Sequence, residues 1–105
     1  MIRERTHFTV KNVAGWNEAL DLIHEIDEIQ LAAGRATGRV WTQVAGQFNE
    51  LIIETDYQDL GTYQRETEAL MSDPAAAKLF PCFEEITVAD KGYNELFMSA
   101  DKAGG

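Results

Sequence analysis

The sequence predicts a small α+β domain whose elements follow the order β-α-β-β-α-β around an antiparallel sheet, and three patterns indicate it. Residues 6–10 alternate between polar and apolar side chains, which is typical of a half-buried strand. Residues 14–33 repeat apolar side chains at helical spacing. Residues 39–44 and 50–55 alternate again on either side of a turn that contains glycine, as the strands of a hairpin do.

The first strand and the first helix should pack against each other. Phe8 and Val10 point to one face of the sheet and His7 and Thr9 to the other, because successive side chains of a strand alternate. The helix is expected to stop at Gly34, since glycine tolerates the left-handed conformation of a helix end. Its apolar stripe comprises Trp16, Ala19, Leu20, Ile23, Ile26 and Ile29.

A two-residue turn at 46–47, with glycine supplying the positive φ, predicts the register of the hairpin. The predicted pairs are Trp41 with Ile52, Arg39 with Glu54, Val40 with Ile53 and Thr42 with Leu51. One face then carries Val40, Thr42, Val44, Leu51 and Ile53, and the other carries Arg39, Trp41, Gln43, Glu50, Ile52 and Glu54. We expect the first of these faces to lie under the helices.

A second amphipathic helix follows the hairpin. Either Asp56 or Asp59 caps its start, because an aspartate side chain accepts hydrogen bonds from the free N–H groups of the first turn. The helix ends near Ser72. Its stripe comprises Leu60, Tyr63, Thr67, Leu70 and Met71.

The C-terminal part is predicted to add a short helix and the fourth strand. An N-cap aspartate and a proline at 73–74 favour a helix over 75–80, which Pro81 should stop. Residues 84–88 alternate and predict the fourth strand. Residues 95–99 follow a turn and form either a fifth strand or an extension of the sheet.

Length and charge limit the class of protein. The chain has 105 residues, 45% of them apolar, which is enough for one domain, expected over residues 1–100 with a flexible tail at 101–105. Its net charge is −9, from 18 acidic and 9 basic residues, and no stretch gathers the basic ones. Such a chain repels phosphate backbones and anionic lipids, so we expect neither nucleic acid nor membrane as a partner.

A cytoplasmic location is expected. The first residues carry charge where a signal peptide needs an apolar run, and no segment approaches the ~20 apolar residues of a membrane span. Cys82 is the only cysteine, which fits a reducing compartment and excludes an internal disulfide.

The sheet face that bears Trp41 and Ile52 predicts a homodimer. Two helices cover only one face of a four-stranded sheet, so the other face should be polar if it meets water. Trp41 and Ile52 form a large apolar patch there, and such patches usually mark an interface. The simplest cover is the same face of a second copy, related by twofold symmetry. The alternative is a single tryptophan lying on an exposed sheet.

Three short segments carry a resemblance to a known family. They are Ile2-Arg3-Glu4-Arg5-Thr6, then Val10-Lys11 before the first helix, and Ser72-Asp73-Pro74 followed by Phe80. Together with the element order and the hairpin, they resemble the dimeric α+β barrel proteins of the ferredoxin-like superfamily. These include the NIPSNAP-like and antibiotic biosynthesis monooxygenase-like families. The resemblance covers residues 2–100.

The resemblance implies a ferredoxin-like sandwich with an antiparallel sheet that pairs into a dimeric α+β barrel. Members of the superfamily are cofactor-free monooxygenases, haem-degrading enzymes, decarboxylases, isomerases or proteins without known activity, so the fold leaves the reaction open. The haem-degrading members place a histidine ligand on or just after the second helix. No histidine follows His24 here, so we expect no haem. We expect no other cofactor either.

His7 is the candidate catalytic base. A histidine suits proton transfer near neutral pH, and only His7 lies on the sheet face that a partner subunit would close off from water. The alternative is a structural histidine held by a carboxylate. His24 follows a core residue of the first helix and is expected at the rim or in solvent.

The candidate ligand-binding residues are Arg39, Trp41, Glu54 and Tyr63. Arg39 and Glu54 form either a structural ion pair or an anion site, and Trp41 and Tyr63 either wall a pocket for an aromatic compound or pack in the core or interface. No spacing of His, Asp and Glu indicates a metal site.

Two functions remain open from the sequence. One is a small cofactor-free enzyme, monooxygenase-like by its resemblance, acting on a hydrophobic or aromatic molecule in a pocket between helices and sheet. The other is a non-catalytic dimer that binds a small ligand or regulates another protein.

Overall fold

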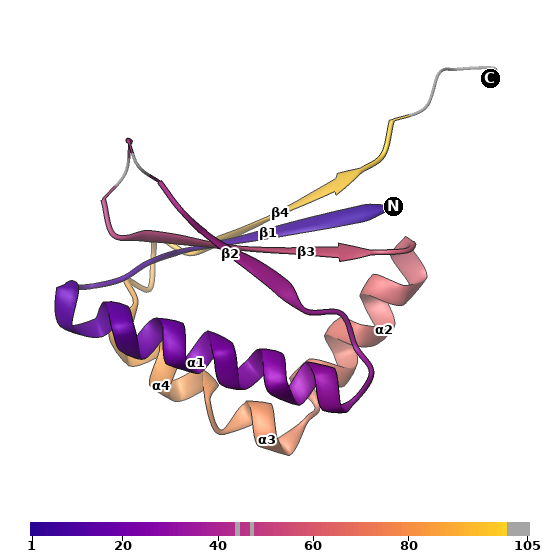
Figure 1. Ribbon diagram of the computed structural model, residues 1–105, viewed down its shortest axis with the longest axis horizontal. Coiled ribbons are helices and arrows are strands. Elements are labelled where there is room, and N and C mark those ends of the chain that lie inside the picture. The colour runs from indigo at the N-terminus through magenta and orange to yellow at the C-terminus, as the bar shows by residue number, and fades with distance from the viewer. Residues whose placement is uncertain (44, 47, 101–105) are drawn as a thin grey trace.

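The computed structural model describes residues 1–43, 45–46 and 48–100. They form a four-stranded antiparallel sheet in the order β2-β3-β1-β4, with the helices on one face of it (Figure 1). The predicted β-α-β-β-α-β order is therefore confirmed. In chain order the elements are β1 (Ile2–Thr9), α1 (Val13–Ala32), β2 (Gly38–Thr42), β3 (Glu50–Tyr57), α2 (Leu60–Met71), α3 (Pro74–Ala77), α4 (Phe80–Ile86) and β4 (Tyr93–Met98).

The predicted register of the hairpin is confirmed. Trp41 pairs with Ile52 and Arg39 with Glu54, and the paired residues end at Thr42 opposite Leu51. Within the predicted turn Gly46 has a φ of 117°, whereas residues 44 and 47 lie outside the described residues.

A side chain caps the start of each of the two long helices, and a glycine follows the end of the first. Asn12 caps α1 by accepting a hydrogen bond from the N–H of Gly15, and the chain leaves the helix through Gly34, at φ 71°. Asp59, rather than Asp56, caps α2, with its Oδ1 2.7 Å from the N–H of Thr62. Asp56 instead lies inside β3.

The prediction for residues 75–88 is correct at its start and wrong beyond it. Asp73 caps α3 and Pro74 begins it, as predicted, but this helix ends at Ala77. Pro81 does not stop a helix: it lies in the first turn of α4, where a proline is tolerated because that turn leaves N–H groups unpaired anyway. Residues 84–86 belong to this helix, and only Thr87 makes an isolated bridge, to Val10. The fourth strand is β4, close to the segment 95–99 for which a fifth strand or an extension was predicted.

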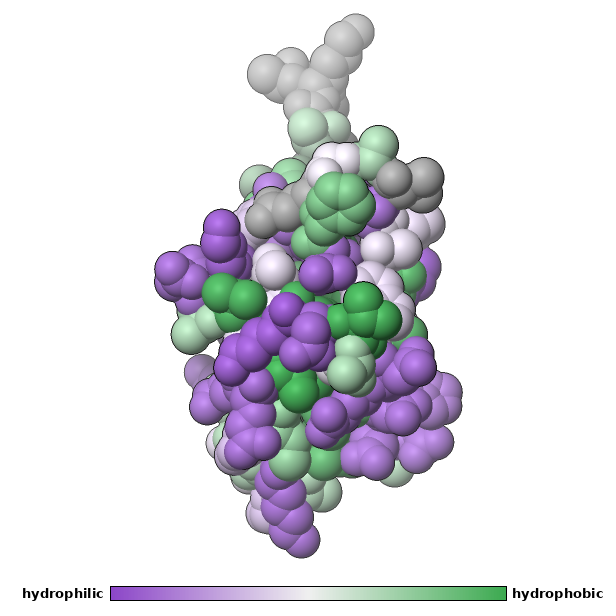
Figure 2. All heavy atoms as spheres, turned by 90° about the vertical axis from the view of Figure 1, so that its left-hand side faces the viewer, coloured by the Kyte–Doolittle hydropathy of each residue, from purple (hydrophilic) through white to green (hydrophobic). Residues whose placement is uncertain are grey.

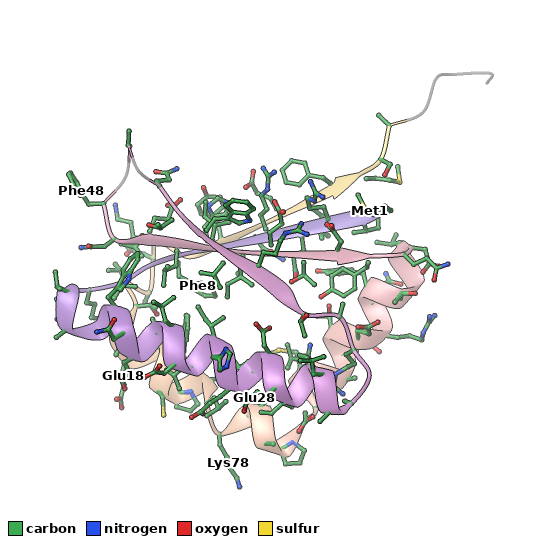
Figure 3. All side chains as sticks on the ribbon, viewed as in Figure 1. Met1, Phe8, Glu18, Glu28, Phe48 and Lys78 are labelled. Carbon is green, nitrogen blue, oxygen red and sulfur yellow. The ribbon has the colours of Figure 1, made fainter. Side chains whose placement is uncertain are left out.

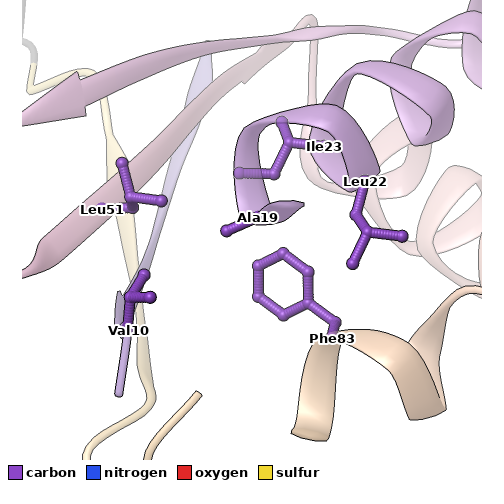
Figure 4. Packing of buried hydrophobic residues seen from close by; sticks show 6 residues of the cluster. All are labelled: Val10, Ala19, Leu22, Ile23, Leu51 and Phe83. Carbon is purple, nitrogen blue, oxygen red and sulfur yellow. The ribbon is translucent and has the colours of Figure 1, made fainter. Parts of the chain in front are cut away.

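Helical structure in α4 brings Phe83 into the core. The ring of Phe83 meets the ring of Phe8 edge to face, with the centroids 4.5 Å apart. Phe8 lies between the sheet and the helices (Figure 3). The cluster of buried apolar residues that forms the core, seen in Figure 4, comprises Val10, Ala19, Leu22, Ile23, Leu51 and Phe83.

The surface at one end of the molecule is mixed in character. At the end of the molecule that lies on the left in Figure 1, apolar side chains stand among hydrophilic ones (Figure 2). No helix within the described ranges is long and apolar enough to cross a membrane.

Candidate active site on the open sheet face

The face of the sheet opposite the helices is open in this structure (Figure 1). Side chains alternate along each strand, so this open face collects one set of residues from all four strands. In the centre lie Arg3, Arg5 and His7 of β1 and Glu50, Ile52, Glu54 and Asp56 of β3, flanked by Arg39 and Trp41 of β2 and by Tyr93, Glu95 and Phe97 of β4.

His7 is held between two carboxylates. Its Nδ1 lies 3.1 Å from Oε1 of Glu50 and its Nε2 lies 2.5 Å from Oε1 of Glu95. The imidazole also stacks on the ring of Tyr93, with the centroids 4.0 Å apart and the planes inclined by 11°. Strands on both sides of β1 therefore fix the orientation of this ring.

The hydrogen bonds of His7 define what it can do chemically. A neutral imidazole donates one hydrogen bond, whereas the protonated ring donates two. Both contacts are satisfied when the ring is protonated, or when one of the two carboxyl groups carries the proton. Glu50 is only 3% exposed, whereas the side chain of Glu95 is 40% exposed. His7 therefore connects a buried carboxylate to one that reaches solvent, which is the arrangement of a short proton relay.

Beside this group, three arginines surround two carboxylates. Arg3 binds Asp56 through two nitrogens, at 2.7 and 3.1 Å, and Arg5 binds Glu54 at 2.8 Å. Arg39 bridges both carboxylates, at 2.5 Å from Glu54 and 3.2 Å from Asp56. The ion pair predicted between Arg39 and Glu54 is thus present, as one link of a larger network.

The network holds its carboxylates ionised. Hydrogen bonds from Arg5 and then Arg39 lower the pKa of Glu54. The hydrogen bond from Arg3 is the main reason that the pKa of Asp56 falls to about 2. Neither group carries a proton near neutral pH, so neither acts as a general acid there. Of the ionisable groups on this face, His7 and its two carboxylate partners lie outside this arginine network.

A shallow hollow of about 540 Å³ lies between the two groups. Trp41 and Ile52 supply apolar walls, and His7 lies at its edge. The remaining lining residues are Arg3, Arg5, Gln43 and Glu54. The lining thus combines one aromatic and one aliphatic side chain with five polar or charged ones.

The structure brings four of the five predicted site residues to one face: His7, Arg39, Trp41 and Glu54. Tyr63 does not join them. It lies on α2, where its ring meets the ring of Tyr57 edge to face at 5.3 Å, on the helix side of the sheet. Tyr63 and Trp41 therefore do not wall one pocket. The other histidine, His24, is exposed on α1, as expected.

Sequence reasoning missed several members of the site, above all Glu95, Tyr93, Arg3 and Arg5. Residues 2–7 alternate in the structure, but the positions that face the helices include Glu4 and Thr6, so both faces look polar in the sequence. This hid the strand signal N-terminal to residue 6. Among the described residues, no group of three or more His, Cys, Asp or Glu side chains is placed to hold a metal ion.

Comparison with solved structures identifies the class of fold. No protein-family model matches the sequence, and no curated protein matches it. Among solved structures, a NIPSNAP domain protein from Burkholderia xenovorans superposes with a TM-score of 0.76 at 19% identity, over 95% of each chain. A NIPSNAP family protein from Agrobacterium tumefaciens gives a TM-score of 0.75 at 16% identity, over 98% of this chain and 96% of the other.

An enzyme also shares the fold. SnoaB, a cofactor-independent oxygenase from Streptomyces nogalater, superposes with a TM-score of 0.70 at 10% identity, over 99% of this chain and 97% of that one. The chain therefore has the ferredoxin-like α+β fold. Within that class its structural neighbours are NIPSNAP proteins and antibiotic biosynthesis monooxygenase-like proteins, as the resemblance implied.

Proposed function

We propose that this protein is a cofactor-free, monooxygenase-like enzyme that acts as a homodimer on a hydrophobic or aromatic small molecule. The observation that carries the proposal is the His7 group: an imidazole fixed by Glu50 and Glu95 at the edge of a hollow walled by Trp41 and Ile52. The fold shared with a cofactor-independent oxygenase supports the same reading.

The proposed reaction starts with proton transfer to His7. The exposed carboxylate of Glu95 moves off Nε2, and an acidic C–H of the substrate takes its place. Nε2 accepts the proton, and Glu50 stabilises the resulting imidazolium through Nδ1. The substrate carbanion then reduces O₂: a CH₂ group next to a conjugated carbonyl becomes C=O, and the second oxygen atom leaves as water. Substrate supplies all the electrons, so the balance needs no other reductant.

The homodimer is proposed through the open sheet face. Trp41 is 52% exposed, Tyr93 52% and Phe97 42%, and all three stand on this face. A second copy of the same face would cover these rings and close the hollow from water. Exclusion of water strengthens the electrostatic interactions that the proton transfer depends on.

Sedimentation tests the assembly. The parent should sediment at twice 11.8 kDa at micromolar concentration, and Trp41→Glu should sediment as a monomer, because a buried charge replaces a buried ring. The matched control is Val13→Glu, which adds the same charge at an exposed residue of α1 and should stay dimeric. A monomeric parent, or a Trp41→Glu variant as dimeric as the parent, contradicts this face as the interface.

Oxygen uptake with anthrone tests the chemistry, because anthrone has an acidic CH₂ group beside a carbonyl. We expect His7→Gln to lose about 100-fold or more in rate, since glutamine keeps a hydrogen bond but cannot take up the proton. His24→Gln should keep the parental rate. An unchanged rate in a folded His7→Gln dimer, or a greater loss in His24→Gln, removes His7 as the base.

One observation favours a second function, a non-catalytic dimer that binds a small ligand. Both nitrogens of His7 already have partners, as those of a structural histidine do. This reading predicts that anthrone quenches tryptophan fluorescence without oxygen uptake, and that His7→Gln binds it as well as the parent. Oxygen uptake that depends on His7 would instead support the enzymatic function.

A further inference from the structure

A second hollow lies on the other side of the sheet, between α1 and the edge strand β2. Its volume is about 360 Å³, which suits a molecule with one ring. Leu20, Ile23 and Val40 supply apolar walls. The polar groups that line it are Asp21, His24 and Asp27, and no lysine or arginine is among the lining residues.

Asp27 is the unusual member of this second hollow. It is half-buried, and its only hydrogen bond within the described part of the chain is a long one, 3.4 Å from Oδ1 to the N–H of Gly38. No lysine or arginine of the described residues lies within salt-bridge distance of it, whereas Asp73 binds Arg35 at 2.9 Å. Burial raises the pKa of Asp27, because the lost hydration disfavours the carboxylate more than the N–H of Gly38 and the nearby His24 favour it.

A role in starting β2 does not account for this carboxylate. The contact with Gly38 uses one oxygen, and a neutral asparagine would accept that hydrogen bond equally well. The other oxygen accepts no hydrogen bond from the described residues, although the side chain lies beside apolar walls. This oxygen is not among the buried atoms without a partner, so it keeps contact with solvent and a ligand that enters the hollow can reach it.

We propose that the α1–β2 hollow binds a small organic cation, an ammonium group on a single-ring aromatic or branched aliphatic body. The ammonium would donate hydrogen bonds to the free oxygen of Asp27, while the body would lie against Leu20, Ile23 and Val40. This site is independent of the proposed function, because the two hollows share no residue and lie on opposite faces of the sheet.

Titration with 2-phenylethylammonium, followed by ¹H–¹⁵N NMR, tests the proposal. Shifts should centre on residues 20–27 and 40, and the neutral isostere 2-phenylethanol should bind at least about fivefold more weakly, as expected for a partly exposed charge pair. Asp27→Asn should weaken the binding of 2-phenylethylammonium by a similar factor and leave the affinity for 2-phenylethanol unchanged. It should also melt at the same temperature as the parent or higher, since it removes an uncompensated charge.

The matched control is Glu18→Gln, which removes the same charge from an exposed residue of α1 outside the hollow (Figure 3). It should leave the affinity for 2-phenylethylammonium within about twofold of the parent, because exposed charges contribute little. Equal binding of cation and alcohol, an unaffected Asp27→Asn, or an equal loss in Glu18→Gln would overturn the proposal. The last result would mean unspecific attraction to an acidic protein.

Discussion

Nε2 of His7 lies 2.5 Å from Oε1 of Glu95, a contact that spans 88 positions of the sequence. It ties the last strand to the centre of the sheet by side chains, in addition to the backbone ladder of β1 and β4. On its other side the same ring holds Glu50, which is almost fully buried. His7 thus supports the structure of the site as well as its proposed chemistry.

Replacing His7 by phenylalanine should destabilise the fold. The ring would keep its stacking on Tyr93, but Glu50 would be a buried carboxylate without its partner, at a cost of about 2–4 kcal/mol. Urea unfolding measures this, with His24→Phe as a control that should change stability by less than about 0.5 kcal/mol. A His7→Phe variant as stable as the parent would mean that water solvates Glu50.

Acid should lower the stability of the folded state between pH 4 and pH 2. The folded-state pKa of Asp56 is about 2, below its ordinary value of 3.8, and that of Glu54 is also lowered. A lowered pKa stabilises the folded state above the ordinary value, and this contribution is lost as the pH falls through the folded-state value. In Asp56→Asn the fall in urea midpoint over this range should be shallower. A parental slope in that variant would assign the acid sensitivity to other carboxylates.

Gly38 should not tolerate a side chain. A Cβ atom at this position would lie 2.7 Å from Cγ2 of Ile53 and 2.9 Å from Oγ1 of Thr55, so β2 and β3 would have to shift. Gly38→Ala is expected to lose about 1–3 kcal/mol of unfolding free energy. Gly92→Ala is the control, because its nearest neighbour would lie at an ordinary 3.7 Å. Equal stability of the two variants in thermal unfolding would contradict the close packing at Gly38.

The N-cap of α2 should contribute measurably to the free energy of unfolding. Asp59→Ala removes the acceptor 2.7 Å from the N–H of Thr62 and should lose about 1 kcal/mol in urea unfolding. The neighbouring exposed residue provides the control, Gln58→Ala, for which we expect almost no change. If both variants lose the same amount, the effect belongs to the loop and not to the cap.

The parts of the fold that local patterns encode were predictable. A tight turn and matched alternation are enough to pair Trp41 with Ile52, and the same alternation places His7 on the face away from the helices. Residues 84–88 were predicted wrongly because a short apolar alternation fits a strand and one turn of helix equally well. The packing of Phe83 on Phe8, which decides between them, is a tertiary contact.

The candidate site was predictable only in part, for a related reason. The partners of His7 come from two other strands, and Glu95 lies on a strand whose pairing with β1 no local turn determines. Tyr63 was placed with Trp41 because both are aromatic. The structure separates them by the thickness of the sheet, since the stripe of α2 turns toward Tyr57.

The strand order also constrains how the chain can acquire its structure during synthesis. β1 is made first and lies in the interior of the sheet, yet one of its two neighbours, β4, is made last. Until β4 has left the ribosome, β1 can pair with β3 alone, and its other edge, including His7, stays unpaired. Long-range strand pairing forms slowly, and an unpaired edge can recruit foreign strands. The interval before Glu95 emerges is therefore the time at which a nascent chain is most exposed to aggregation.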